Sequence, residues 1–214
     1  MSEAVRGSTR DIARAAVRAE LTRVALELFR RDGFAQVTLD DLAAAAGVSR
    51  STFLRYFGTK EDAVLAAFDG FDRQLADALR ARPADEDDWT ALRRALDTLI
   101  VRYRQDPAGS LVTTRLVRET PALRARNLEK QYTWRPALEA ALAERAGAEQ
   151  PTLAQSVRAA AALACLNVTL DHWLASDGEL DLVRLLDEAF AALASQRPGG
   201  TKKPNGTRQA GRGQ

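Results

Sequence analysis

Residues 33–62 read GFAQVTLDDLAAAAGVSRSTFLRYFGTKED and carry the strongest pattern in the chain. Thr38 is expected to cap a short helix over 38–46, because Asp41 follows three residues later and completes a capping-box pair. Gly47 ends this helix, since glycine tolerates the left-handed conformation beyond a helix end. Ser49 caps the next helix, 50–57. Two short helices joined by a tight Gly-Val-Ser turn are typical of a helix-turn-helix.

The second of these short helices is expected to present small and polar side chains outward, anchored by Phe53 and Phe57. Arg50, at its start, can hold guanine O6 and N7 through two hydrogen bonds, or can contact a phosphate instead. Thr52 can meet a thymine methyl group, a phosphate or only solvent. Arg55 favours a phosphate or an intramolecular salt bridge over a base. The predicted DNA-binding residues are Thr38, Ser49, Arg50, Ser51, Thr52, Arg55, Tyr56 and Lys60.

Composition favours helices throughout the chain. The 214 residues are 46% hydrophobic and 28% charged, and alternating strand patterns are nearly absent. We therefore predict an all-α fold, with an N-terminal helix-turn-helix three-helix domain and a C-terminal helical ligand-binding and dimerisation domain. About nine helices are expected, over 9–32, 38–46, 50–57, 60–82, 89–106, 108–119, 121–145, 151–175 and 179–196.

Charge and composition also suggest domain boundaries. The formal net charge is +2, but residues 197–214 contain five basic residues and no acidic one, so the rest of the chain is net acidic. A basic end on an acidic body suits a small DNA-reading unit. We predict a flexible arm over 1–8, a DNA-binding domain over 9–60, an effector-binding and dimerisation domain over 61–196 and a disordered basic tail over 197–214. Arg6 and Arg10 are candidates for the minor groove, and a disordered arm is the alternative.

The sequence offers little material for catalysis. Cys165 is the only cysteine and His172 the only histidine, so no disulfide framework, cysteine zinc site or histidine-rich metal site can form within one chain. No glycine-rich phosphate loop is present, and an enzyme is disfavoured. No signal peptide and no uninterrupted apolar stretch of spanning length is found, so we expect a cytoplasmic protein without a membrane partner.

Residues 10–65 resemble the DNA-binding domain of TetR-family repressors. The likeness is carried by Gly33-Phe34, by the run 37–43, by 46–53, by Arg55-Tyr56-Phe57 and by 59–62, at matching spacing. The resemblance implies phosphate contacts for Tyr56 and Lys60 and repression as a homodimer on a palindromic operator in double-stranded DNA. Leu54 departs from the pattern, because many members have a phosphate-contacting tyrosine there.

The C-terminal part is similar to an actinobacterial subgroup described as acyl-CoA-like ligand-binding regulators, related to the mycofactocin regulator. The similarity rests on LVRETPALRAR at 116–126 and DEAF at 187–190. It implies no cofactor but a small amphiphilic or acyl-CoA-like effector. An aromatic wall with a few polar groups suits such a ligand. The predicted pocket residues are Trp89, Leu96, Leu99, Tyr103, Leu111, Thr114, Arg115, Arg118, Trp134, Asn167, Asp171 and Trp173.

The last two helices carry apolar stripes and are the predicted dimer interface, because a two-fold dimer places two reading helices on one face of DNA. The alternative is that the stripes pack only within one chain. The stripes consist of Leu153, Val157, Ala161, Ala164 and Val168 on the first helix, and Leu182, Leu185, Leu186, Ala189, Phe190 and Leu193 on the second.

Two other functions remain open from the sequence. One is an activating or effector-independent DNA-binding protein. The other is a helical interaction module with a vestigial helix-turn-helix. The sequence itself separates neither from a ligand-responsive repressor.

Overall fold

The computed structural model describes residues 9–194, and every regular element within that range is helical. The all-α prediction is confirmed. The predicted arm, with Arg6, and the predicted basic tail lie outside the described residues. The elements are α1 Thr9–Asp32, α2 Leu39–Ala45, α3 Arg50–Tyr56, α4 Lys60–Leu65, the 3-10 turn η1 Ala66–Phe68, α5 Phe71–Arg80, α6 Asp88–Ala95, α7 Asp97–Gln105, α8 Pro107–Glu119, α9 Pro121–Tyr132, α10 Arg135–Arg145, α11 Leu153–Ala175 and α12 Leu182–Ala194.

All nine expected helices are present in the described range, and three of them are divided. The segment 60–82 is interrupted at Gly70, whose φ of +80° strongly favours glycine. The segment 121–145 is interrupted before Pro136, which lies in the first turn of α10 and cannot continue a preceding helix, since it lacks an N–H. The segment 89–106 tightens at Leu96, where the amide of Leu99 donates to the Leu96 carbonyl.

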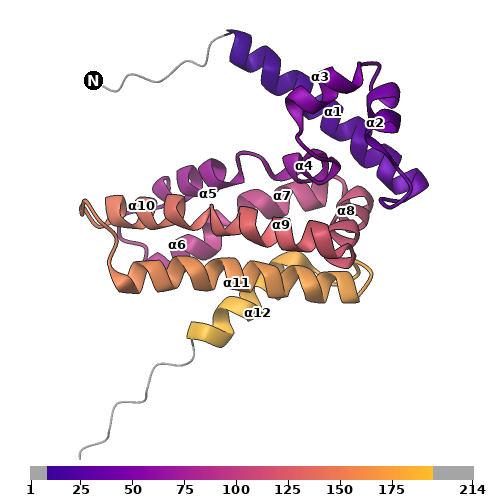
Figure 1. The fold of residues 1–214 in the computed structure, drawn as a ribbon. Helices are drawn as coiled ribbons and strands as arrows, with labels where there is room; N and C mark the ends of the chain where they lie inside the picture. Colours follow the sequence, from indigo (N-terminus) through magenta and orange to yellow (C-terminus); the bar gives the residue numbers. More distant parts are fainter. Residues whose placement is uncertain (1–8, 195–214) are drawn as a thin grey trace, which may run out of the picture.

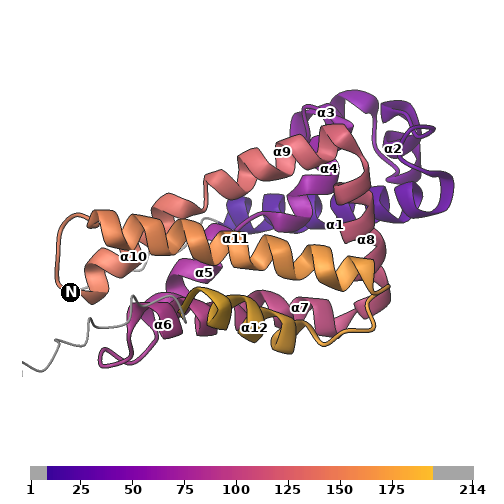
Figure 2. The ribbon, with the colours of Figure 1, turned by 90° about the horizontal axis from the view of Figure 1, so that it is seen from below.

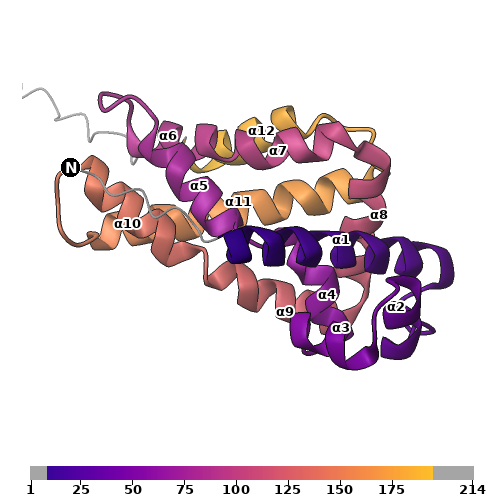
Figure 3. The same cartoon turned by 90° about the horizontal axis from the view of Figure 1, so that it is seen from above.

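The helices form a small head at one end of a larger body (Figure 1). The head consists of α1, α2 and α3, with α4 leading into the body. Seen from above, α1 runs along one side of α4, and α2 and α3 lie at the outer edge (Figure 3). A hydrophobic core fixes this arrangement, because α1 contributes Leu21, Ala25 and Phe29, while α3 contributes Phe53.

A second core fills the body. α5 packs on α10, and α11 packs on both α10 and α12, as the view from below also shows (Figure 2). Leu75, Leu92, Leu142 and Leu186 are fully buried in it. α11 is the one described helix that is long and apolar enough to cross a membrane by length and composition, and 44% of its apolar window is buried against the rest of the chain.

Candidate DNA-binding face and effector cavity

The helix α3 is fixed from inside and at its first turn. Phe53 and Phe57 are almost completely buried in the head core, with ring centroids 5.1 Å apart. The Ser49 hydroxyl accepts the amide of Thr52 at 3.1 Å, which satisfies a donor that the helix itself leaves free. On α2, Thr38 and Asp41 form the expected capping box. The short helix therefore has a defined orientation, although seven residues alone would not be stable as a helix.

The opposite face of α3 is open to solvent and polar. Arg50, Ser51 and Arg55 are exposed, and Thr52 and Tyr56 are partly exposed. The predicted DNA-contacting residues of α3 lie on this face, and α3 lies on the outside of the head (Figure 1). Leu54, 38% exposed, adds one apolar side chain.

Arg50 is already paired within the head. Its guanidinium lies 3.1 Å from the carboxylate of Asp40 on α2. Both side chains are well exposed, so the pair is weak and can be exchanged for a DNA partner at low cost.

Lys60, at the start of α4, has an internal role that the sequence did not indicate. Its ammonium donates to the carbonyl of Phe34 at 2.8 Å and of Val37 at 3.3 Å. The same nitrogen lies 4.3 Å from the centre of the Phe34 ring. Lys60 therefore fixes the loop that precedes α2. The expected phosphate contact remains a prediction.

A cluster of charges joins the head to the body. Asp69, after η1, binds the guanidinium of Arg18 on α1 at 2.8 Å and also the ammonium of Lys130 on α9. Burial alone would raise the pKa of Asp69, but these two partners outweigh it and hold the pKa below its usual range. Arg18 also donates to the carbonyl of Tyr56 at the end of α3 and lies over the Phe57 ring.

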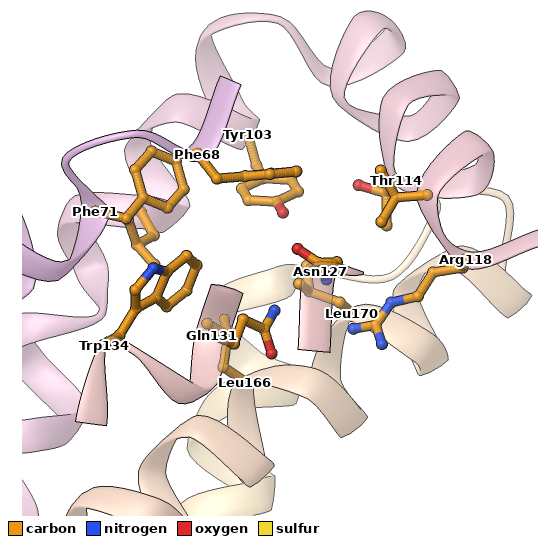
Figure 4. A pocket seen from close by; sticks show the side chains of 12 residues that line it. Phe68, Phe71, Tyr103, Thr114, Arg118, Asn127, Gln131, Trp134, Leu166 and Leu170 are labelled. Carbon is orange, nitrogen blue, oxygen red and sulfur yellow. The ribbon is translucent and has the colours of Figure 1, made fainter. Parts of the chain in front are cut away.

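A small cavity lies in the body (Figure 4). Its volume is about 20 Å³, close to the space that one water molecule needs. Larger ligands therefore require its walls to move apart. The cavity is lined by Phe68, Phe71, Leu99, Tyr103, Thr114, Val117, Arg118, Asn127, Gln131, Trp134, Leu166 and Leu170.

Aromatic rings form one side of this cavity. Phe71 packs edge-on against Phe68, and its ring centroid lies 5.6 Å from that of Trp134. Tyr103 stands perpendicular to Trp173, with centroids 5.5 Å apart. Burial raises the pKa of the Tyr103 hydroxyl, partly opposed by its hydrogen bond with Thr114. Tyr103 is therefore neutral at physiological pH.

The other side of the cavity carries a chain of polar groups. Arg118 lies 3.3 Å from the carboxylate of Asp171 and donates to the Asn167 side-chain oxygen at 2.8 Å. The Asn167 amide nitrogen in turn donates to the Gln131 side-chain oxygen at 2.6 Å. Asn127 differs, because its side-chain oxygen is buried and has no hydrogen-bond partner.

The structure brings five of the twelve predicted pocket residues to the cavity wall, namely Leu99, Tyr103, Thr114, Arg118 and Trp134. Three more contact residues of that wall without lining the cavity. Asn167 and Asp171 bind Arg118, and Trp173 packs against Tyr103. The remaining four do not line this cavity.

Each of these four side chains has a different environment. Trp89 packs on Phe190 with ring centroids 4.3 Å apart, because α6 lies against α12. Leu96 is buried in the body core. Leu111 packs near Gly178. Arg115 is partly exposed and pairs with Asp177 and Glu119.

The sequence reasoning missed Phe68, Phe71, Val117, Asn127, Gln131, Leu166 and Leu170. One signal for two of them was present. Leu123, Asn127 and Gln131 follow one another at four-residue intervals and all three are buried on one face of α9. Two amides on the apolar face of a helix are unusual, and they indicate a polar interior site.

The predicted dimer stripes behave differently on the two helices. On α11, Leu153, Val157 and Val168 are 83%, 58% and 51% exposed, and Ala164 and Ala161 continue the same line as exposed and partly exposed residues. On α12, Leu182, Leu186 and Phe190 are buried in the chain's own core, so the prediction is corrected there. They face α6, α7 and α11 and cannot also face a second chain. Leu185 and Ala189 are partly buried against the same core, and Leu193 is exposed.

Comparison with known proteins assigns the family. A model named for bacterial regulatory proteins of the tetR family matches residues 21–67. A model of the MftR C-terminal domain matches residues 86–198, more than half of the chain. The chain belongs to the TetR family of bacterial transcriptional regulators. Both resemblances expected from the sequence are thus confirmed, and a TetR-family protein is a regulator and not an enzyme.

Named relatives agree with this assignment. The transcriptional regulator TcmR of Streptomyces glaucescens is 30% identical over 192 residues, which are 85% of this chain and 83% of TcmR. A protein named as the mycofactocin biosynthesis regulator MftR of Mycobacterium tuberculosis is 27% identical over 179 residues, 82% of this chain and 88% of MftR. Among solved structures, Thermus thermophilus FadR in complex with lauroyl-CoA has the same fold, with a TM-score of 0.57 and 23% identity over 88% of this chain and all of FadR.

Proposed function

We propose that this TetR-family protein is a ligand-responsive repressor that binds a palindromic operator as a homodimer in the cytoplasm. The observation that carries the proposal is the polar, solvent-facing side of α3 on a helix whose other side is anchored by fully buried Phe53. A rigid helix with one free polar face fits the major groove of B-DNA.

The proposed DNA contacts follow from the exposed residues of the head. Arg50 and Thr52 are the base readers, at the start of α3. Tyr56, Arg55 and Lys60 are the phosphate contacts, and Thr38, Ser49 and Ser51 border the same face. Phosphate contacts fix the register, and the base contacts give the sequence preference.

The proposed dimer uses the exposed apolar line of α11. Leu153, Val157 and Val168 are large apolar side chains with more than half of their surface open to solvent. Alanines between them allow close approach of a second helix. Leu193 at the end of α12 borders the same surface, since it lines a groove together with Val157 and Ala161. An isologous contact along this line would pair two heads for two half-sites.

The proposed response to ligand uses the short segment between the cavity and the head. Phe68 and Phe71 line the cavity, and Asp69 between them binds Arg18, which holds the end of α3 through the Tyr56 carbonyl. A ligand that separates the two phenylalanines therefore moves a group that is tied to α3. Such a ligand changes the DNA affinity only to the extent that it binds more tightly to one of the two conformations of the protein than to the other.

Selection from a pool of random DNA duplexes tests the proposal. We expect enrichment of an inverted repeat whose half-site centres lie about one helical turn, roughly 34 Å, apart. Binding of two chains per repeat, measured by analytical ultracentrifugation, is expected in addition. Enrichment of no sequence, or of a single unrepeated site bound by one chain, would refute it. A reporter gene behind the selected repeat then separates repression from activation.

A further inference from the structure

One polar atom in the effector cavity has no partner in the protein. Asn127 is only 5% exposed, and its side-chain oxygen is buried without a hydrogen bond. In the close view this residue points from α9 into the space below Tyr103 (Figure 4). An unpaired buried acceptor destabilises the protein, so a ligand that supplies a donor at this point gains more than one that does not.

The other polar side chains discussed for the cavity already have partners within the protein. Arg118 is held by Asp171 and by Asn167, and the Gln131 oxygen already accepts from Asn167. Because the charge of Arg118 is compensated by Asp171, the cavity does not require an anionic ligand.

The remaining wall favours flat rings over a long chain. Phe68, Phe71, Tyr103 and Trp134 come from three separate parts of the sequence and together form one side of the cavity. Aromatic faces gain additional energy from ring–ring contacts. The present volume of about 20 Å³ is small, and a flat ring can enter between these rings by parting two walls.

We infer that the effector of this protein is a compact neutral aromatic molecule whose hydroxyl group donates a hydrogen bond to the Asn127 side-chain oxygen. The inference rests on the proposed function, since it names the chemistry of the ligand that the repressor senses. Asn127 is then the residue that distinguishes a hydroxylated ring from a purely apolar one.

Isothermal titration of the free protein with 2-naphthol, naphthalene and lauroyl-CoA tests this inference. 2-Naphthol and naphthalene have the same rings and differ by one hydroxyl. We expect 2-naphthol to bind wild type about tenfold more tightly than naphthalene, the effect of one buried hydrogen bond. In Asn127→Leu, which keeps the branched shape of the side chain and removes the acceptor, this preference for 2-naphthol over naphthalene is expected to disappear.

Three results would overturn the inference: no binding of 2-naphthol to wild type, an unchanged preference in Asn127→Leu, or binding of lauroyl-CoA alone. Thermal unfolding of Asn127→Leu serves as the folding control, and its Tm is expected to equal or exceed that of wild type, because the variant loses an unsatisfied group. DNA binding to the selected repeat is measured separately. If the repeat is bound but 2-naphthol is not, the ligand inference fails and the proposed repressor stands.

Discussion

Replacement of Phe53 by alanine tests how the reading helix is held in place. Phe53 has no exposed surface, lies 5.1 Å from the Phe57 ring and is the residue by which α3 enters the head core. Removal of a buried phenylalanine side chain costs about 3–5 kcal/mol, through lost burial and the cavity left behind. A whole domain is stable by about 5–15 kcal/mol, so this loss is a large part of the total.

The loss is expected to be local. The head core and the body core are separate clusters, and Phe53 belongs only to the first. Hydrogen exchange should therefore show lost protection of the α2 and α3 amides, while the α11 amides stay protected. Urea unfolding gives the free-energy change, and fluorescence anisotropy with the selected DNA repeat should show loss of specific binding.

Leu54→Ala is the matched control, one residue further along the same helix. Leu54 is 38% exposed, and we expect its removal to cost less than about 1 kcal/mol. A cost for Phe53→Ala below 1 kcal/mol, or equal to that of Leu54→Ala, would refute the reasoning. Equal loss of protection in α11 would refute the separation of the two cores.

Three further predictions concern charge and assembly. Lys60→Met keeps the stem over Phe34 but removes the charge. It should weaken binding to all DNA sequences alike and lower the salt slope by about 0.9 for each chain, or about 1.8 for the dimer on its repeat; an unchanged slope contradicts the proposed phosphate contact. Val157→Asp on the exposed line of α11 should convert dimers to monomers in analytical ultracentrifugation, whereas Val101→Asp, at a similarly exposed site on α7, should not; an intact Val157→Asp dimer contradicts the interface. Asp69→Ala should cost about 1 kcal/mol at pH 7, after allowance for solvent screening of its two partly exposed ion pairs. Because the folded-state pKa of Asp69 is lowered, this difference from wild type should be complete above the unfolded pKa of about 3.9 and shrink as the pH falls below it. A difference that is independent of pH across this range contradicts the ion-pair explanation.

The helix-turn-helix could be predicted from the sequence because its signals are local. Thr38 with Asp41, Gly47 and Ser49 each act within a few residues, and the structure contains the caps that they indicate. Breaks in the longer helices were harder to foresee. Gly70 and Pro136 mark two of them, but a regular apolar period continues across both positions and hides the interruption.

The cavity was only partly predictable, because it depends on contacts between distant segments. Tyr103 lies on α7 and Trp134 in the turn between α9 and α10, and the period of each helix alone does not show which residues meet. Trp89 has the same aromatic character but lies against Phe190 instead. Likewise, an apolar stripe on α12 does not reveal whether its partner is the same chain or a second one. Because Leu186 is buried within its own chain, the stripe on α12 packs there.

We propose above all that Arg50 at the start of α3 reads bases in both half-sites of a repeat. The direct test replaces each base pair of the selected repeat in turn and measures the affinity of wild type and of Arg50→Ala. The claim predicts that the variant loses about 1–3 kcal/mol of discrimination at one position and at its symmetry mate, and keeps the preference elsewhere. A variant that retains the full wild-type preference at every position would contradict it.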